Sequence, residues 1–357
     1  MHGDGGGLAP GEVLDRWPTI PRTAAALRRT GAIEIDTVIR TRHASEVIER
    51  DGVEHRFVHD TSRTGRQIAR AVRGAGPDVV HVNGTGYAVP TIALALPPRR
   101  PPRIVVQHHG EPPGQGRARL AQATARRAVD GYLFTGALHG QTEPFVAAGI
   151  LRTDTPCFEV LESASDVDAV PREEARRRTG VRGDPAIGWV GRLIEGKDPL
   201  TALFAFSRVL DALPGARLWI VAASREMETI VRSELLDDAV LSKAVEIVGP
   251  IPHRDMGAWF SSFDVFLSTS RREGSGYSLI EALTCGCSAV VSDIPPHRAI
   301  AGPGGRRFPV GDAGAAAASL VAAAFDPVDQ TSAASAAAAR LGWDTVARQL
   351  LVAYGVA

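Results

Sequence analysis

The chain has 357 residues, with 40 Lys plus Arg balanced by 40 Asp plus Glu; 44% of its residues are hydrophobic and 22% are charged. This length predicts two domains, and a formal net charge of zero argues against a nucleic-acid binder that works by neutralising phosphates. No apolar run is long enough for a transmembrane helix, and the first residues lack the pattern of a signal peptide, so we expect a cytoplasmic protein.

Lysine occurs only at positions 197 and 243, and the other basic residues are arginine. Together with many Ala, Gly and Pro residues, this bias indicates GC-rich, actinobacterial-like coding. A lysine retained against such a bias is a candidate functional residue. The three cysteines, at positions 157, 285 and 287, do not have the spacing of a metal site or a disulfide framework, so we predict buried thiols.

In the first half, short β-branched runs alternate with helical patterns, which is typical of parallel α/β layers. The predicted strands are 33–40, 78–84, 103–110, 132–136 and 158–162. The predicted helices are 64–76, 87–96 and 116–129.

After residue 165 the alternation starts again. The predicted strands are 186–192, 217–223, 245–251, 264–270 and 288–293. Helices are predicted over 199–213, 255–263 and 278–286, and the Ala-rich stretch 313–341 is helical by propensity. The fold class is therefore α/β, with two doubly wound sheets. Such sheets bind ligands outside the carboxyl ends of their strands, so candidate site residues lie at those ends.

The first candidate segment is 189–203, where Arg192 and Lys197 flank a turn between a strand and a helix. Asp198 is the expected N-cap, and Pro199 the first or second residue of that helix. An Arg fork and a Lys point charge can converge on one polyanion. The alternative is a pair of solvated surface cations, but the rarity of lysine favours a phosphate ligand at Lys197.

The second segment, 268–286, places Glu273 at a strand end and Glu281 about one turn into the following helix. Gly274 and Gly276 leave backbone amides uncovered before that helix, which predicts an anion site. A carboxylate inside such a helix can accept hydrogen bonds from ribose hydroxyls. The loop beginning at Gly249 and Pro250 is expected to form a wall for a nucleobase.

Four motifs run in order through the second half: G-R-x4-K at 191–197, V-G-x-I from 248, D-V-F-L-S-x4-E-G-x-G-x4-E-A-L-x-C-G from 264, and S-D-I-P-P-H-R from 292. This order resembles the retaining GT-B glycosyltransferases of the large family that includes sucrose synthases and bacterial mannosyltransferases, the glycosyl transferases group 1. Weaker resemblance lies in Gly5–Gly7, in V-V-H-V-N-G at 79–84, in Q-H-H-G at 107–110 and in residues 341–354.

The resemblance implies the GT-B fold, with two Rossmann-like domains facing across a cleft. Residues 1–165 would form the acceptor-binding domain. No strand is expected before its glycine-rich segment, so either translation starts upstream or this domain lacks the first strand that relatives carry. Residues 166–335 would form the nucleotide-sugar domain, and 336–357 a helix that crosses back. Gly5–Gly7 would be a donor or acceptor loop, the alternative being a disordered terminus.

The resemblance also implies a role for each matching residue. Arg192 and Lys197 would hold the donor diphosphate, Glu273 the donor-sugar hydroxyls and Glu281 the ribose. His109 would contact the donor sugar near the reacting centre, the alternative being a structural histidine. Strand alternation makes His108 the weaker choice. The rest of the expected nucleotide-sugar site consists of Gly191, Gly249, Pro250, Gly274, Ser275, Gly276, Tyr277 and Ser278.

The expected reaction moves a sugar from UDP- or GDP-sugar to an acceptor hydroxyl with retention. No metal or cofactor is expected, because no D-x-D motif lies at a strand end. The acceptor stays open among a sugar, a cyclitol, a secondary metabolite and a lipid. Peripheral membrane contact is a further alternative, because four basic residues could form a helix face for anionic lipid: Arg117, Arg119, Arg126 and Arg127. Ala299 stands where relatives often have an acidic residue.

The alternatives to a glycosyltransferase are a non-catalytic GT-B nucleotide-binding subunit and a GT-B epimerase or phosphorylase.

Overall fold

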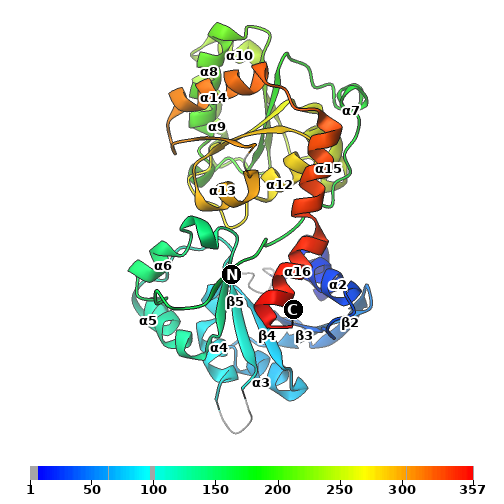
Figure 1. Ribbon diagram of the computed structural model, residues 1–357, viewed down its shortest axis with the longest axis vertical. Coiled ribbons are helices and arrows are strands. Elements are labelled where there is room, and N and C mark those ends of the chain that lie inside the picture. Colours follow the sequence, from blue (N-terminus) through cyan, green and yellow to red (C-terminus); the bar gives the residue numbers. More distant parts are fainter. Residues whose placement is uncertain (1–6, 63, 97–100, 303, 357) are drawn as a thin grey trace. The chain divides into compact units, whose positions relative to one another are not determined.

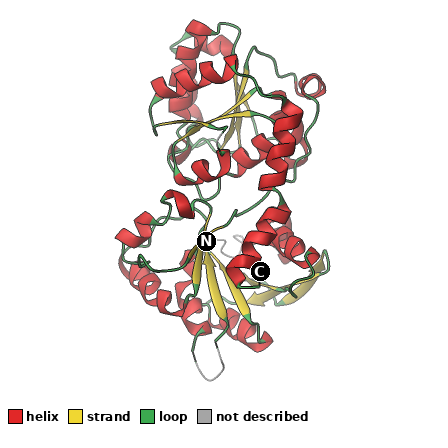
Figure 2. Cartoon of the chain, viewed as in Figure 1, coloured by secondary structure: helices red, strands yellow, loops and turns green. Residues whose placement is uncertain are grey.

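The structure is a computed structural model that describes residues 7–62, 64–96, 101–302 and 304–356 (Figure 1). The chain divides into two compact units. Unit 1 comprises Met1–Ser163 and Trp343–Ala357, and unit 2 comprises Ala164–Gly342. In both units helices flank the strands (Figure 2).

In the described part of unit 2, the strands form one six-stranded sheet in the order β10-β9-β8-β11-β12-β13. Every pairing is parallel. Counted within the unit, the order is 3-2-1-4-5-6, which is the Rossmann arrangement. The strands are β8 (Ala186–Gly191), β9 (Arg217–Ala222), β10 (Val245–Val248), β11 (Val265–Ser268), β12 (Ser288–Ser292) and β13 (Arg306–Phe308).

Helices cover both faces of this sheet, because successive strand residues point to opposite sides. Ile187 and Trp189 pack in a core with α8 and α14, whereas Gly188 faces Phe263 at the end of α11. The helices are α7 (Arg172–Thr179), α8 (Pro199–Ala212), α9 (Glu228–Leu236), α10 (Ala239–Ala244), α11 (Met256–Ser262), α12 (Tyr277–Thr284), α13 (Pro295–Ala301), α14 (Ala313–Phe325) and α15 (Gln330–Leu341).

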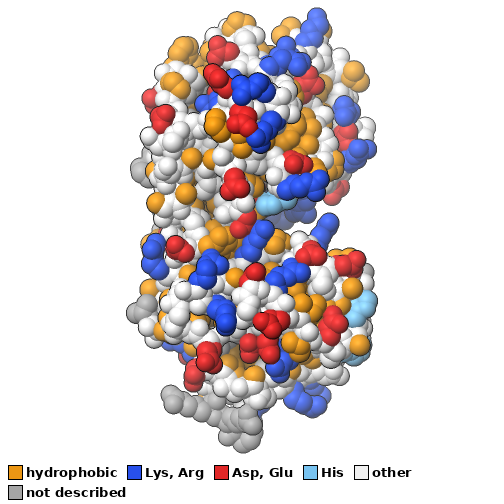
Figure 3. Space-filling model, turned by 90° about the vertical axis from the view of Figure 1, so that its right-hand side faces the viewer, with side chains coloured by type: hydrophobic (Ala, Val, Ile, Leu, Met, Phe, Trp, Pro, Cys, Tyr) orange, Lys and Arg blue, Asp and Glu red, His pale blue; other side chains and the backbone are white. Residues whose placement is uncertain are grey.

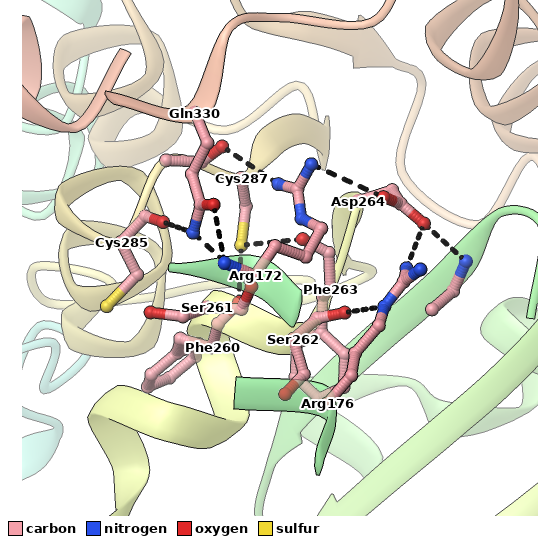
Figure 4. Close-up of polar contacts among 12 residues, drawn as sticks. Arg172, Arg176, Phe260, Ser261, Ser262, Phe263, Asp264, Cys285, Cys287 and Gln330 are labelled. Atoms are coloured by element: carbon pink, nitrogen blue, oxygen red, sulfur yellow. Dashed lines mark hydrogen bonds and ion pairs between the residues drawn. The ribbon is translucent and has the colours of Figure 1, made fainter. Parts of the chain in front are cut away.

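A polar network ties the first and last helices of unit 2 to α11 (Figure 4). Asp264 accepts hydrogen bonds from Arg176 Nη2 (2.6 Å) and from the backbone N–H of Ala186 (2.7 Å). The Gln330 amide accepts from the backbone of Arg172 (3.1 Å) and donates to the carbonyl of Cys285 (3.1 Å). The network therefore joins the start of α7, where the chain enters this unit, to the start of α15.

In unit 1 the described strands form two sheets rather than one, a three-stranded β1-β3-β2 and a four-stranded β4-β5-β6-β7. The second sheet is parallel throughout, and β5 and β6 are buried apolar strands. The strands are β1 (Thr37–Thr41), β2 (Glu46–Arg50), β3 (Val53–His59), β4 (Val79–Asn83), β5 (Arg103–Gln107), β6 (Gly131–Phe134) and β7 (Cys157–Glu159).

The C-terminal helix α16 (Trp343–Tyr354) belongs to unit 1, where it lies beside α2 and contacts β5 and β7 (Figure 1). Tyr354 Oη is 2.8 Å from His81 Nδ1, and Arg103 donates to the carbonyl of Ala353 (3.2 Å). The other helices of this unit are α1 (Pro10–Arg16), α2 (Thr19–Arg29), α3 (Arg66–Ala75), α4 (Ala88–Leu94), α5 (Gly116–Ala125) and α6 (Glu143–Ala147).

Three of the differences between the structure and the sequence prediction concern a hairpin, the Ala-rich stretch and the domain boundary. The hairpin of β2 and β3 was not predicted, because its polar, exposed strand β2 lacks the apolar pattern. The Ala-rich stretch contains two helices, α14 and α15, which Asp326 and Pro327 separate. The boundary expected at 335/336 falls inside α15, which packs on α12 and stays in unit 2 to Gly342.

Acidic and basic side chains are interspersed on the face shown in Figure 3, in keeping with the balanced composition. Across the described ranges, none of the helices combines the length and apolarity that a membrane span requires. Cys285 and Cys287 are buried as predicted, while Cys157 is half-buried; all three are free thiols.

Candidate functional site

Lys197 lies in a turn that two neighbouring strands hold in place. It ends a 3-10 turn, η5 (Glu195–Lys197), which follows β8, and Asp198 caps α8 by accepting from the N–H of Thr201. Beyond the end of β11, Thr269 Oγ1 contacts the carbonyls of Lys197 (2.9 Å) and Asp198 (2.8 Å). The cap was predicted from the sequence, and the cross-strand anchor was not.

Glu273 forms an ion pair with Lys197, in which Lys197 Nζ donates to Glu273 Oε1. Ser270 Oγ donates to the same carboxylate oxygen at 2.6 Å. The two charged side chains are only 22% and 12% exposed, so solvent screens the pair weakly. The structure therefore brings together the cation and the carboxylate that the sequence placed 76 residues apart.

These side chains line a hollow at the carboxyl ends of β8 and β11. Gly276 and Ser278 line it too, from the start of α12. Gly276 caps this helix with a φ of 70°, a left-handed conformation that favours glycine. The hollow thus combines an ammonium group, a carboxylate and the positive end of a helix dipole.

His297 also lines the hollow, and no role was predicted for it from the sequence. Its ring is buried, and Nδ1 is 2.8 Å from the carbonyl oxygen of Ser292. Burial lowers the pKa of His297, which keeps the ring neutral near pH 7. Its position in the S-D-I-P-P-H-R motif was the available signal.

Glu281 is buried within α12, and its Oε1 is 2.6 Å from Nε2 of His253. His253 begins the 3-10 turn η6 (His253–Asp255), in the loop expected to face a nucleobase. Its ring also stacks on Tyr277, with centroids 6.2 Å apart. The His253 contacts were not predicted from the sequence.

Other predicted residues lie around the hollow rather than in its lining. Gly191 ends β8, and Arg192 is exposed beside the exposed Glu226. Gly249 and Pro250 are exposed after β10. The turn that joins β11 to α12 contains Gly274 and Ser275. Arg192 is therefore exposed at the end of β8 and does not line the hollow.

In unit 1, His109 follows β5 and Glu162 follows β7, on either side of the intervening strand β6. His109 Nδ1 is 2.6 Å from Glu162 Oε1, and the backbone N–H of His109 donates to Glu111 (2.8 Å). Burial opposes protonation, but the Glu162 carboxylate outweighs it and raises the pKa of His109.

His108 packs against aromatic side chains of unit 1. Its ring is buried and stacks on Phe134, with centroids 4.9 Å apart. Burial lowers the pKa of His108. Of the glycine-rich start, Gly5 lies outside the described residues, whereas the Gly7 carbonyl is 2.8 Å from His43 Nε2. In the part of the chain that the structure describes, no cluster of three or more His, Cys, Asp or Glu residues has metal-site geometry.

Comparison with known proteins adds three findings. Residues 184–326 match the family described as Glycosyl transferases group 1. The 2-deoxystreptamine N-acetyl-D-glucosaminyltransferase of Streptomyces fradiae is 30% identical over 228 residues, which are 59% of this chain and 53% of that protein. The match thus spans about half the length of this relative.

The third finding is a likeness to solved structures. A glycosyltransferase from Rickettsia africae ESF-5 superposes with a TM-score of 0.73 at 15% identity, over 97% of this chain and 95% of that one. Anabaena HepE, solved in complex with UDP and glucose, superposes with a TM-score of 0.68 at 15% identity, over 95% of each chain. At these identities the likeness establishes the fold.

Proposed function

We propose, on the premise that residues 184–326 are a Glycosyl transferases group 1 domain in a chain of GT-B fold, that this protein transfers a sugar from a nucleoside-diphosphate sugar to an acceptor hydroxyl. One observation carries the proposal. Lys197, Glu273 and the start of α12 meet in one hollow at the carboxyl ends of adjacent strands.

The chemistry of this hollow suits departure of a nucleoside diphosphate. Negative charge grows on the leaving phosphate as its bond to the sugar breaks, and groups that stabilise that charge accelerate the step. The Lys197 ammonium and the backbone amides at Gly276–Ser278 provide fixed positive potential. Glu273 can accept hydrogen bonds from sugar hydroxyls, and Glu281 from the ribose.

The finer features follow from the same residues and are part of the proposal. Because Lys197 and the helix start can neutralise a diphosphate, we propose that transfer needs no metal ion and no cofactor. We propose retention at the anomeric carbon, in line with the motif order of residues 191–298. Both UDP- and GDP-sugars remain donor candidates; the UDP complex of Anabaena HepE favours testing UDP first.

The acceptor proposal rests on the relative from Streptomyces fradiae, whose name gives 2-deoxystreptamine as its acceptor. We propose a cyclitol or a related small polyhydroxylated acceptor as the first class to assay.

For His109 we propose a contact with the donor sugar, a role that is separate from the chemistry of the unit 2 residues. Replacing His109 with Ala should lower the transfer rate while leaving binding of UDP or GDP unchanged.

The test is a transfer assay on the full chain with UDP- and GDP-sugars and a panel of cyclitol and sugar acceptors. Lys197→Ala and Glu273→Ala should each reduce donor turnover about 10²- to 10³-fold. Lys243→Ala is the matched control, since Lys243 is the other lysine and lies exposed in α10. Unchanged turnover in both site variants rules out the proposal.

Two further measurements test the finer features. Transfer should persist in excess EDTA, and a requirement for added Mg²⁺ or Mn²⁺ would reject metal independence. The coupling constant of the anomeric proton in the product should match that of the donor; the opposite configuration would reject retention.

A further inference from the structure

The strongest unassigned feature in unit 2 is the contact of His253 with the buried carboxylate of Glu281. His253 Nε2 lies 2.6 Å from Glu281 Oε1, within the range of a charge-assisted hydrogen bond. Because a carboxylate can only accept, Nε2 carries the proton in this bond. The residues are 28 positions apart, and they come from the loop after β10 and from α12.

His253 is held in two independent ways. Tyr277 and Glu281 are four residues apart on α12 and therefore lie on the same side of that helix. The imidazole stacks on the Tyr277 ring at an interplanar angle of 22° and donates to Glu281. The stack sets the plane of the imidazole and the hydrogen bond sets its direction, so His253 spans the first turn of α12.

The carboxylate of Glu281 needs such a partner because it is buried. Its side chain is 5% exposed, whereas that of His253 is 46% exposed. An ionised carboxylate in that position is costly unless hydrogen bonds compensate it. In the described part of the chain, the recorded side-chain bonds of Glu281 engage Oε1 and leave the second oxygen to a ligand.

We propose that His253 is a positioning residue for nucleotide recognition: by holding Oε1 of Glu281, it fixes the carboxylate so that the other oxygen accepts from the ribose hydroxyls. The inference rests on the proposed function, because it presumes that the ribose of the donor binds at Glu281. Orienting the carboxylate before the ligand arrives removes an ordering cost from binding. His253 thereby sets selectivity for a ribose over a 2′-deoxyribose.

Calorimetric titration of the full chain with UDP, GDP and their 2′-deoxy counterparts tests this role. The wild-type protein should bind the ribonucleotide about tenfold or more tightly than its 2′-deoxy form. In His253→Ala, affinity for the ribonucleotide should fall about tenfold and affinity for the 2′-deoxy form should hardly change. Selectivity for ribose would then be nearly lost, as it should be in Glu281→Gln.

Two variants serve as controls. Arg254→Ala changes the next side chain of the same turn, which is exposed, and should keep the selectivity of the wild type. His253→Gln keeps an N–H donor and should recover part of the selectivity. Thermal unfolding of each variant verifies that it folds, and the ratio of two affinities in one variant cancels a general loss of stability.

The outcomes separate this inference from the function it rests on. If the wild-type protein binds none of the four nucleotides, both the proposed function and the inference fail. If the wild type is selective and His253→Ala stays equally selective, the inference alone fails. The inference is also overturned if His253→Ala loses affinity equally for the ribonucleotide and its 2′-deoxy form. Tighter binding of UDP or GDP by His253→Ala overturns it too, because that result would mean that His253 blocks the site.

Discussion

Lys197 and Glu273 neutralise each other across the turns that follow β8 and β11. The proposed ligand of the phosphate is thus paired with the proposed ligand of the sugar. A nucleoside diphosphate that binds here competes with Glu273 for the ammonium group. A nucleotide sugar gives both residues a partner, because its hydroxyls bind the carboxylate while its phosphates bind the ammonium.

This competition predicts opposite effects of one substitution on two ligands. Glu273→Gln should tighten binding of free UDP or GDP by about 1 kcal/mol, since it releases Lys197 and removes a negative charge. The same variant should bind the corresponding nucleotide sugar more weakly. Glu195→Gln, an exposed change in the same turn as Lys197, is the control and should alter neither affinity. Weaker binding of both ligands by Glu273→Gln would instead show that Glu273 holds Lys197 in place.

The pair His109–Glu162 predicts a shift in a titration. The Glu162 carboxylate counteracts burial and raises the pKa of His109, so Glu162→Gln should lower that pKa. Titration of the imidazole protons by NMR measures it directly. Glu159→Gln alters a carboxylate beside His139 instead and should leave the His109 titration unchanged. An unshifted pKa in Glu162→Gln contradicts the assigned cause.

The burial of His81, which lies beside Tyr354, predicts sensitivity to acid. Burial lowers the pKa of His81 to about 4, against 6.5 for the ordinary value. Between these values the unfolded chain binds the proton and the folded chain does not, so stability falls as the pH drops from about 6.5 to 4. The loss attributable to this histidine is roughly 3 kcal/mol.

Chemical denaturation at pH 7 and pH 4.5 measures that loss. His81→Gln keeps a polar side chain but cannot titrate, so its stability should fall less over the same interval. Tyr354→Phe retains His81 and should keep most of the pH dependence while losing about 1 kcal/mol at pH 7. Equal pH dependence in the wild type and His81→Gln would refute the assignment.

Packing predicts a cost for enlarging one glycine of the central strand β8. A Cβ at Gly188 would stand 2.1 Å from Cδ2 of Phe263, so Gly188→Ala should destabilise unit 2 by about 1–3 kcal/mol. Gly74→Ala is the matched control: nothing lies within 4 Å of its Cβ and the site is inside α3, so it should stabilise the protein slightly. Chemical denaturation, followed with a probe for the unfolding of each unit, measures the stability change in both variants. A neutral Gly188→Ala would mean that Phe263 moves away freely.

The sequence by itself determined most of unit 2. The apolar runs predicted the five strands β8 to β12 to within a few residues, because a strand covered on both faces must be nearly continuous in apolar residues. Local spacing also predicted the Asp198 cap and the positions of Lys197 and Glu273 at strand ends, since a strand, a turn and a helix start lie within a dozen residues.

The contacts that decide the chemistry came only with the tertiary structure. Glu273 reaches Lys197, His253 reaches Glu281 and Glu162 reaches His109 over 76, 28 and 53 residues, respectively. Which strand ends become neighbours depends on the order of strands in each sheet, and that order is set by packing of the whole unit. Periodicity shows that a residue lies at a strand end; the partner it meets there follows from the folded sheet.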